Sequence, residues 1–391
     1  MVPGDIGAEL AKVLRAAAAA DELPATAAAF PVAGTWRPAP PGEGSGPGTY
    51  ATSLPILLAR GTGRDARSLA AWLAAALDPV PWIAAARGSG PGYLTVTVTT
   101  RHLAALPARI AAGFRRAAPF APPIAVPIDP PLPDPAAAPD WPAAWHAQRD
   151  VLALRLAGAA GPDNPDFAPQ RHDIGNRWLA TDSTSGPGPA GGAVAGGAVA
   201  GGPVTAAVAW HGADAVRYAL ARTAGPRPAA IERQLGLPLD LDNPFVLVRY
   251  ARAHAASTAR WAADHARAAG SRGRAGRPEP RSWPGPGAGS PEPQPAELAL
   301  LGSLSWSAER LAAAVRRRRP AELCAYLEQV AAAYLHCARQ CPAMPSGGAA
   351  APDPASPQAA ARLELAAAAG AVLTGGLRLA GVSSPEELFD I

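Results

Sequence analysis

The side chains best suited to bind a charged ligand lie in one stretch, from residue 242 to residue 269, where arginine, histidine and aromatic residues recur. Asp242 or Asn243 can cap a helix there, and Pro244 suits its first turn. At about 100° per residue, this helix gathers its arginines in an arc of roughly 80°. They are Arg249, Arg252, Arg260 and Arg267. Guanidinium groups on one arc can meet an anion.

A second face of the same helix carries larger rings and apolar side chains at the i, i+3, i+4, i+7 spacing of a packed helix. Its members are Leu247, Tyr250, Ala251, His254, Thr258, Trp261 and His265. The spacing predicts that this face packs while the arginine arc stays in solvent. For Tyr250 and His254, burial in a core and contact with a ligand both remain open.

The amino-acid composition excludes several kinds of catalytic and binding function for this chain. Lys12 is the single lysine of the 391 residues and lies outside any phosphate-binding or Schiff-base motif, so those functions are excluded. The three cysteines, Cys324, Cys337 and Cys341, form no Cys-x-x-Cys pair, which favours buried thiols over a metal or disulfide site. We therefore expect no cofactor and no metal. The pI of about 9.2, carried by arginine, permits a nucleic-acid partner without requiring one.

The N-terminal part predicts a small α/β domain over residues 1–118. Apolar spacing predicts helices over residues 5–20, 50–60 and 65–77. Residues 93–100 alternate leucine or valine with threonine, the pattern of a half-buried strand. Residues 119–204 follow as a linker rich in proline and glycine, with one expected helix at 141–160. A catalytic role for the pair His172 and Asp173 is disfavoured there, since polar loop pairs are common.

The C-terminal part, residues 205–391, predicts a helical domain. Helices are expected over residues 298–319, 321–341 and 358–380, after a second proline-rich and arginine-bearing linker at 271–295. The fold class predicted for the whole chain is α+β, mainly α. No basic and apolar leader and no long apolar span free of Gly, Pro and charge is seen, so a cytoplasmic protein without a membrane partner is expected.

Two segments of the C-terminal part resemble the anticodon-binding domain of arginyl-tRNA synthetases, called DALR. The first runs from Gly212 to Tyr218 and contains Asp214-Ala-Val-Arg217, and the second joins Asn243-Pro244 to the helix described above. Where the family usually reads Tyr-Ala-His-Ala-Arg, this chain has Tyr250-Ala-Arg-Ala-His254, with the two basic side chains exchanged. The C-terminal run from Leu373 to Glu386 also resembles the family's closing segment.

The N-terminal part resembles the additional domain of the same synthetases, which touches the corner of the tRNA. The similar segments are Gly48-Thr-Tyr-Ala-Thr-Ser-Leu54 and Gly90-Pro-Gly-Tyr-Leu94, with Thr49 and Ser53 in place of the family's Asp and Asn. The resemblance therefore implies that the chain binds tRNA. The residues it brings forward as RNA contacts are Arg249, Tyr250, Arg252, His254, Arg260 and Tyr50.

The family's ATP-binding signatures are missing from the sequence. No histidine stands in a His-x-Gly-His context, and a Lys-Met-Ser-Lys-Ser loop is impossible with Lys12 alone. Both act on ATP phosphates, so we expect a relative that binds tRNA but does not activate arginine. Two alternatives remain open: a regulatory or scaffolding protein that binds a translation component, and a ligase subunit that needs a separate catalytic chain.

Overall fold

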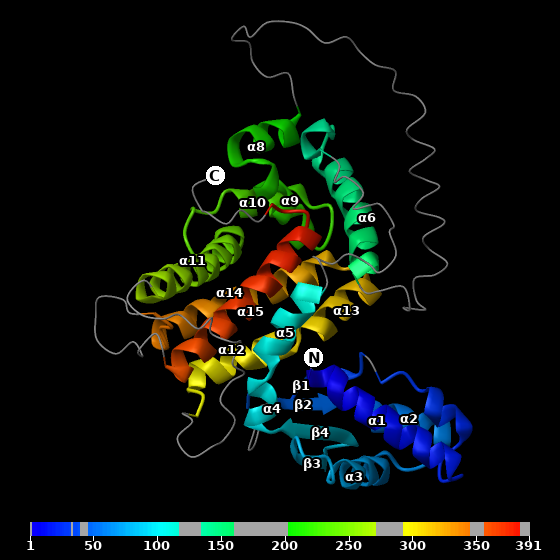
Figure 1. The fold of residues 1–391 in the computed structure, drawn as a ribbon. Coiled ribbons are helices and arrows are strands. Elements are labelled where there is room, and N and C mark those ends of the chain that lie inside the picture. Colours follow the sequence, from blue (N-terminus) through cyan, green and yellow to red (C-terminus); the bar gives the residue numbers. More distant parts are fainter. Residues whose placement is uncertain are drawn as a thin grey trace, which may run out of the picture.

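The computed structural model describes residues 2–32, 34–39, 46–116, 134–159, 202–270, 292–344 and 356–383. It combines a small N-terminal sheet with a larger assembly of helices (Figure 1). The α+β, mainly α class predicted from the sequence is confirmed. The low-complexity repeat, the pair His172 and Asp173 and the linker arginines near residue 280 lie outside the described residues.

Alternating threonine and apolar residues build the sheet, which has the order β1-β2-β4-β3 with every described pair antiparallel. The strands are β1 (Trp36–Pro38), β2 (Thr49–Thr52), β3 (Ile83–Ser89) and β4 (Tyr93–Val98). Leu94, Val96 and Val98 are buried, as the alternation predicts. Thr49 and Thr97 lie opposite each other with hydroxyl oxygens 3.2 Å apart, which gives the polar rows of neighbouring strands a cross-strand contact.

Three helices accompany the sheet: α1 (Val2–Ala19), α2 (Leu54–Thr62) and α3 (Ala66–Leu77). Helix α3 packs against β3 and β4 and begins where the Asp65 carboxylate accepts a hydrogen bond from the Ser68 amide at 2.8 Å. Leu69, Leu73 and Leu77 are buried, so the predicted stripe is the face that packs. Apolar spacing was enough to predict this helix, and the structure adds the Asp65 cap at its start.

The helix predicted over residues 50–60 is wrong at its start. Residues 49–52 form β2, and the helix begins only at Leu54. The Thr52 hydroxyl accepts a hydrogen bond from the Leu54 amide at 3.1 Å, and Pro55 occupies the first turn. Pairing with β4 decides the conformation of this segment, which its short apolar pattern could not reveal. The alanine-rich strand β3 was not predicted either, because it shows no alternation.

The helical region contains more and shorter helices than predicted. The predicted helix over residues 298–319 is two helices that meet at Trp306, and α8 and α10 were not predicted. The helices after the sheet are α4 (Thr100–Ala104), α5 (Leu106–Arg116), α6 (Trp141–Ala159), α8 (Pro203–His211), α9 (Ala213–Arg222), α10 (Pro228–Leu235), α11 (Pro244–Gly270), α12 (Pro295–Ser305), α13 (Ser307–Arg317), α14 (Pro320–Gln340) and α15 (Pro357–Leu379).

Helix α15 lies at the centre of this region, against α5, α11 and α14 (Figure 1). Its small residues permit close approach: the Leu327 side chain of α14 occupies the space that a Cβ atom on Gly376 would need. By length and composition α15 could cross a membrane, but 61% of the apolar window is buried among the other described helices. It serves here as the core helix.

The sheet and the helices share one hydrophobic core. Residues of both belong to a single buried cluster, and α5 packs along α15. Helix α6 docks on the helical region, where the Trp145 indole donates a hydrogen bond to the Thr223 carbonyl oxygen at 3.1 Å. The division at residues 118 and 204 stays a prediction, because 117–133 and 160–201 lie outside the described residues.

Candidate functional site

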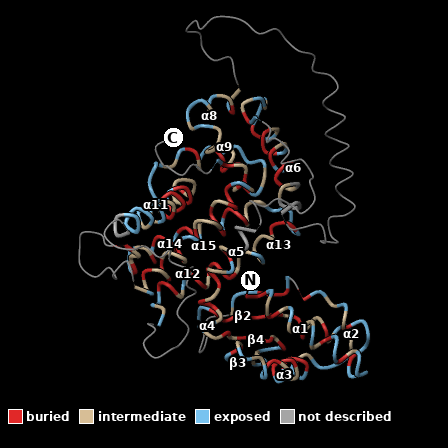
Figure 2. The backbone as a smooth tube through the Cα atoms, in the orientation of Figure 1, coloured by how far each residue is buried: buried red, intermediate tan, exposed pale blue. Residues whose placement is uncertain are grey.

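Helix α11 packs through a face different from the predicted one. Its buried positions Val248, Ala251, Arg252 and Ala255 follow the i, i+3, i+4, i+7 spacing, whereas Tyr250 is 36% exposed. The packing face is therefore turned by about one residue, roughly 100°, from the face predicted by the large side chains. Figure 2 shows that burial is concentrated in the first half of α11 and gives way to exposure toward its C-terminal end.

The small residues of α15 explain this rotation. A Cβ atom on Gly370 would lie 3.1 Å from the Cβ atom of Ala255, so the two helices meet through their smallest side chains. Close approach of backbones gains dispersion contacts that a bulky interface would not allow. The prediction gave weight to rings and leucine, and in this alanine-rich chain that choice was wrong.

Arg252 is consequently not part of a solvent-exposed stripe. It is 8% exposed, and its Nε atom donates a hydrogen bond to the Thr374 hydroxyl of α15 at 3.2 Å. The aliphatic stem of an arginine can pack in such an interface while the guanidinium finds a polar partner. The prediction that Arg252 contacts RNA is therefore corrected: this side chain joins α11 to α15.

Arg249 is buried to a similar extent, 8% exposed, but on the side of α11 that faces α9. Its guanidinium carbon lies 5.2 Å from the centre of the Phe245 ring, and it borders a cavity of about 1020 Å³. Burial lowers the pKa of Arg249, while the Asp214 carboxylate acts in the opposite direction. The side chain remains a cation because an arginine pKa lies far above neutral pH.

Three rings lie along α11 beside its packing face, and we call Tyr250, His254 and Trp261 the aromatic face. Tyr250 is 36% and Trp261 50% exposed. The Nδ1 atom of His254 lies 2.9 Å from the Tyr334 hydroxyl, a hydrogen bond that orients the imidazole. Burial lowers the pKa of His254, so the ring is neutral at pH 7. The exposed rings offer flat surfaces on which a ligand can stack.

A small hollow and one exposed arginine adjoin the aromatic face. The hollow, of about 140 Å³, is lined by His254, Trp261 and Tyr334 among others. Arg260 is exposed on the same half of the helix. Arg267, further along α11, is also exposed and forms an ion pair with Asp264. Of the predicted arginine arc, Arg260 and Arg267 are therefore the exposed members, and Arg260 directly precedes Trp261 in the sequence.

Tyr50 is placed in the core. It is 1% exposed, its hydroxyl donates a hydrogen bond to the Ser305 hydroxyl at 2.8 Å, and its ring lies 5.3 Å from that of Trp306. No face of this ring is open to an RNA base, which corrects its assignment as a contact. It connects β2 to the junction of α12 and α13, because tertiary packing brings these distant segments together.

The Asp214-Ala-Val-Arg217 segment has a structural role at the start of α9. The Asp214 carboxylate accepts a hydrogen bond from the Ser383 amide at 3.0 Å and lies 3.4 Å from the Arg217 guanidinium. Two sequence landmarks separated by 169 positions therefore meet. The neighbouring Tyr218 is buried and donates a hydrogen bond to the Glu328 carboxylate of α14 at 3.1 Å.

The cysteines lie in the core of the helical region. Cys324, Cys337 and Cys341 are all free and buried, and burial raises the pKa of Cys324 to about 12. Within the described ranges, no three His, Cys, Asp or Glu side chains come together in a way that could hold a metal ion. Protonated thiols of this kind behave as small apolar side chains.

One exposed feature has no signature in the amino-acid sequence. Trp210, next to the cavity bordered by Arg249, is 85% exposed, and Leu239 on the other rim is 83% exposed. A lone tryptophan at the end of a short helix has no pattern that distinguishes it from a core residue. Only the packing of α8, α9 and α10 shows that it is left uncovered.

Comparison with known proteins finds a family match in the C-terminal part of the chain. Residues 263–388 match the family described as the DALR anticodon binding domain, a range that begins in the last turns of α11 and includes α12 to α15. The C-terminal helices are therefore similar to the DALR anticodon binding domain.

Arginine–tRNA ligases are among the similar proteins. The enzyme from Micrococcus luteus is 33% identical over 183 residues, which cover 46% of this chain and 30% of the relative. That from Paenarthrobacter aurescens is 32% identical over 181 residues, with the same shares, and that from Frankia alni is 32% identical over 183 residues, 45% of this chain and 29% of the relative. The chain is thus related to arginine–tRNA ligases but matches about 30% of the length of these relatives.

Proposed function

We propose that this protein binds the anticodon loop of a tRNA through the aromatic face of α11 and does not itself attach an amino acid to that tRNA. The observation that carries the proposal is the exposure of Tyr250 and Trp261 on the helix that leads into the DALR anticodon-binding domain. Large aromatic side chains left open on a folded domain commonly mark a binding surface. The related ligases, by their name, act on tRNA.

Stacking gives the aromatic face its affinity for unpaired bases. Each base stacked on an aromatic side chain is worth roughly 1 to 3 kcal/mol. Tyr250 and Trp261 are separated by eleven positions, or about 16 Å along the helix axis, so they can engage different bases. Neutral His254 can hydrogen-bond a base edge, and Arg260 supplies a positive charge for the backbone. Together these groups suit a single-stranded loop better than a duplex.

The absence of arginine activation is proposed from the sequence. ATP phosphates require a preorganised positive site, and neither the His-x-Gly-His nor the Lys-Met-Ser-Lys-Ser signature is present. The purified chain should therefore not catalyse arginine-dependent exchange between pyrophosphate and ATP. Exchange that survives repurification away from the host synthetase would overturn this part of the proposal. A cytoplasmic location follows from the proposed partner.

The binding experiment uses a fluorescent anticodon stem-loop and measures anisotropy against protein concentration. Tyr250→Ala and Trp261→Ala should each weaken binding about tenfold, with the salt dependence preserved, because stacking involves no counterion release. Arg260→Gln should lower the slope of log affinity against log salt by about one unit. Arg233→Gln, at an exposed position of α10, is the matched control and should bind like the unaltered protein.

Thermal unfolding separates loss of contact from loss of fold. Tyr250 and Trp261 are partly exposed, so neither alanine variant should lose more than about 1 kcal/mol of stability. Unchanged stem-loop affinity in both alanine variants would refute the proposed face. If RNA binding is absent while a translation protein binds in a Tyr250-dependent way, the scaffolding alternative would replace the tRNA proposal.

A further inference from the structure

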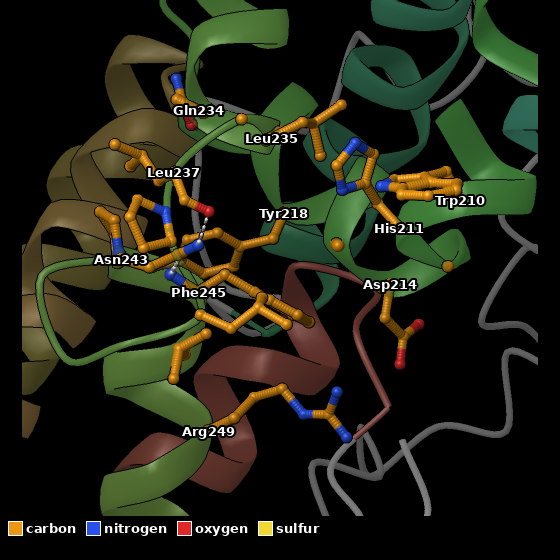
Figure 3. Close-up of a pocket in the computed structure, with 18 of the residues that line it drawn as sticks. Trp210, His211, Asp214, Tyr218, Gln234, Leu235, Leu237, Asn243, Phe245 and Arg249 are labelled. Carbon is orange, nitrogen blue, oxygen red and sulfur yellow. Dashed lines mark hydrogen bonds between the residues drawn. The ribbon is translucent and has the colours of Figure 1, made fainter. Parts of the chain in front are cut away.

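The cavity bordered by Arg249 lies on a different side of α11 from the aromatic face. Its volume of about 1020 Å³ is in the range of small-molecule sites. Figure 3 shows side chains converging on it from the end of α8, the start of α9, the loop after α10 and the start of α11. These include Trp210, Asp214, Phe245 and Arg249.

The cation in this cavity has no acceptor among the residues that the structure describes. Among the described residues, the structure gives the Arg249 guanidinium no hydrogen bond and no ion pair, and its contact is the face of the Phe245 ring. A buried charge without hydrogen-bonding partners costs several kcal/mol in general. A fixed guanidinium that borders an open cavity is suited to bind a carboxylate or phosphate.

The start of α9 adds a second source of positive potential. Gly212 precedes the helix with φ of +81° and provides no side-chain cap, and residues 212–215 border the cavity. The amides of a first helical turn and the helix dipole favour an anion at this end. The nearby Asp214 carboxylate is already held by Arg217 and by the Ser383 amide, which limits its repulsion of a second anion.

The remaining wall is aromatic and apolar. Trp210 is 85% exposed at the rim, and Leu237 and Leu239 line the loop opposite. Figure 3 places Trp210 and Arg249 on different walls of the cavity, with Asp214 between them. The ligand that matches such a site has an anionic group at one end and a flat ring at the other. An inorganic anion would leave the indole uncovered, and an apolar peptide would leave the guanidinium without a partner.

We propose that this cavity binds a nucleoside 5′-phosphate, with the phosphate at Arg249 and the first turn of α9 and the base against Trp210. The same unit can come from a free mononucleotide or from one nucleotide of a single-stranded RNA. The site goes beyond the tRNA-binding proposal, because it uses neither the aromatic face nor Arg260.

Calorimetric titration of the full chain with 5′-AMP, adenosine and a short oligoadenylate tests the site. Arg249→Gln should weaken 5′-AMP about tenfold and leave adenosine unchanged, because only the nucleotide carries the phosphate. Trp210→Ala should weaken both ligands by a similar factor. Arg233→Gln is the control, an exposed arginine of α10 outside the cavity lining. Thermal unfolding confirms that each variant is folded.

The outcomes distinguish the sources of the ligand and the two proposed sites. Binding of both 5′-AMP and oligoadenylate indicates a mononucleotide site, and binding of oligoadenylate alone, sensitive to Arg249 and Trp210, indicates an RNA nucleotide. Tyr250→Ala and Trp261→Ala should retain 5′-AMP affinity, so failure of the aromatic face would leave this result intact. The proposal is overturned if neither 5′-AMP nor oligoadenylate binds, or if Arg249→Gln and Trp210→Ala both bind these ligands with unchanged affinity. Binding of an apolar peptide alone would also overturn it.

Discussion

Two arginines of the helical region are buried to nearly the same extent in opposite surroundings. Arg362 of α15 is 6% exposed and lies 2.7 Å from the Glu297 carboxylate, whereas Arg249 of α11 is 8% exposed beside a cavity. Around Arg362 every contact is internal: its second nitrogen donates to the Pro342 carbonyl oxygen at 3.0 Å. A buried arginine can therefore be a structural ion pair, as at Arg362, or can border a cavity without a described acceptor, as at Arg249.

The Arg362 site is also coupled to secondary structure. Glu297 accepts a hydrogen bond from the Gln294 amide at 2.7 Å and so completes a capping box at the start of α12. One carboxylate thus caps the start of a helix and neutralises a buried cation. Nothing comparable surrounds Arg249, whose closest described partner is an aromatic ring. The first site stabilises the fold, and the second is free to serve a ligand.

The largest effect should come from removing the acceptor at the paired site. Glu297→Ala leaves the Arg362 guanidinium buried without its carboxylate and removes the cap of α12, so the free energy of unfolding should fall by about 3 to 5 kcal/mol. Urea unfolding followed by circular dichroism measures it. Glu297→Gln keeps an acceptor and should lose less. A loss below about 1 kcal/mol for the alanine variant would mean that the pairing is not structural.

An intermediate effect is expected at Glu328, whose carboxylate is 18% exposed and accepts hydrogen bonds from Arg222 at 2.7 and 3.1 Å and from Tyr218 at 3.1 Å. Glu328→Ala should reduce stability by about 1.5 to 3 kcal/mol, less than Glu297→Ala because Arg222 can turn toward water. Tyr218→Phe is the control for the hydroxyl and should cost about 1 kcal/mol. Equal losses of stability in Glu328→Ala and Glu297→Ala would contradict the expectation that the more deeply buried ion pair contributes more.

His254, unlike the two buried arginines, is a partly buried group whose charge depends on pH near neutrality. Burial lowers its pKa from 6.5, so the unfolded chain binds a proton more readily than the folded one. Its contribution is complete above about pH 6.5 and is lost as pH falls through the lower folded pKa. Unfolding measured between pH 7.5 and 5, in steps of roughly half a unit, should show less loss of stability in His254→Gln than in the parent chain. Identical pH profiles would place the titration elsewhere.

The smallest effect should come from the unpaired arginine. Arg249→Gln removes a buried charge that has no acceptor in the described parts of the chain, so its melting temperature should stay the same or rise, with a stability change within about 0.5 kcal/mol. Differential scanning calorimetry without added nucleotide is the measurement. A loss above about 2 kcal/mol would show that Arg249 holds the fold together and would remove the contrast with Arg362.

Local signals in the sequence determined much of the fold. Apolar spacing defined α3 and located α14 and α15 to within two residues, and threonine alternation defined β4. These elements depend on interactions within a few positions of one another, such as capping bonds and face periodicity. The DALR resemblance was likewise visible from residue types and their order, and the family match agrees with it.

The tertiary structure alone decided which side of each element is covered. Periodicity shows which residues of α11 share a face, but the small residues of α15 determine that the face with Ala255 and Arg252 packs and that Tyr250 is exposed. The same holds for Tyr50, which is buried because α12 and α13 lie over β2. Trp210 and Arg249 also border one cavity only because of tertiary packing. Contacts between distant segments depend on how closely their backbones approach, and the sequence of a single helix does not determine the distance between two backbones.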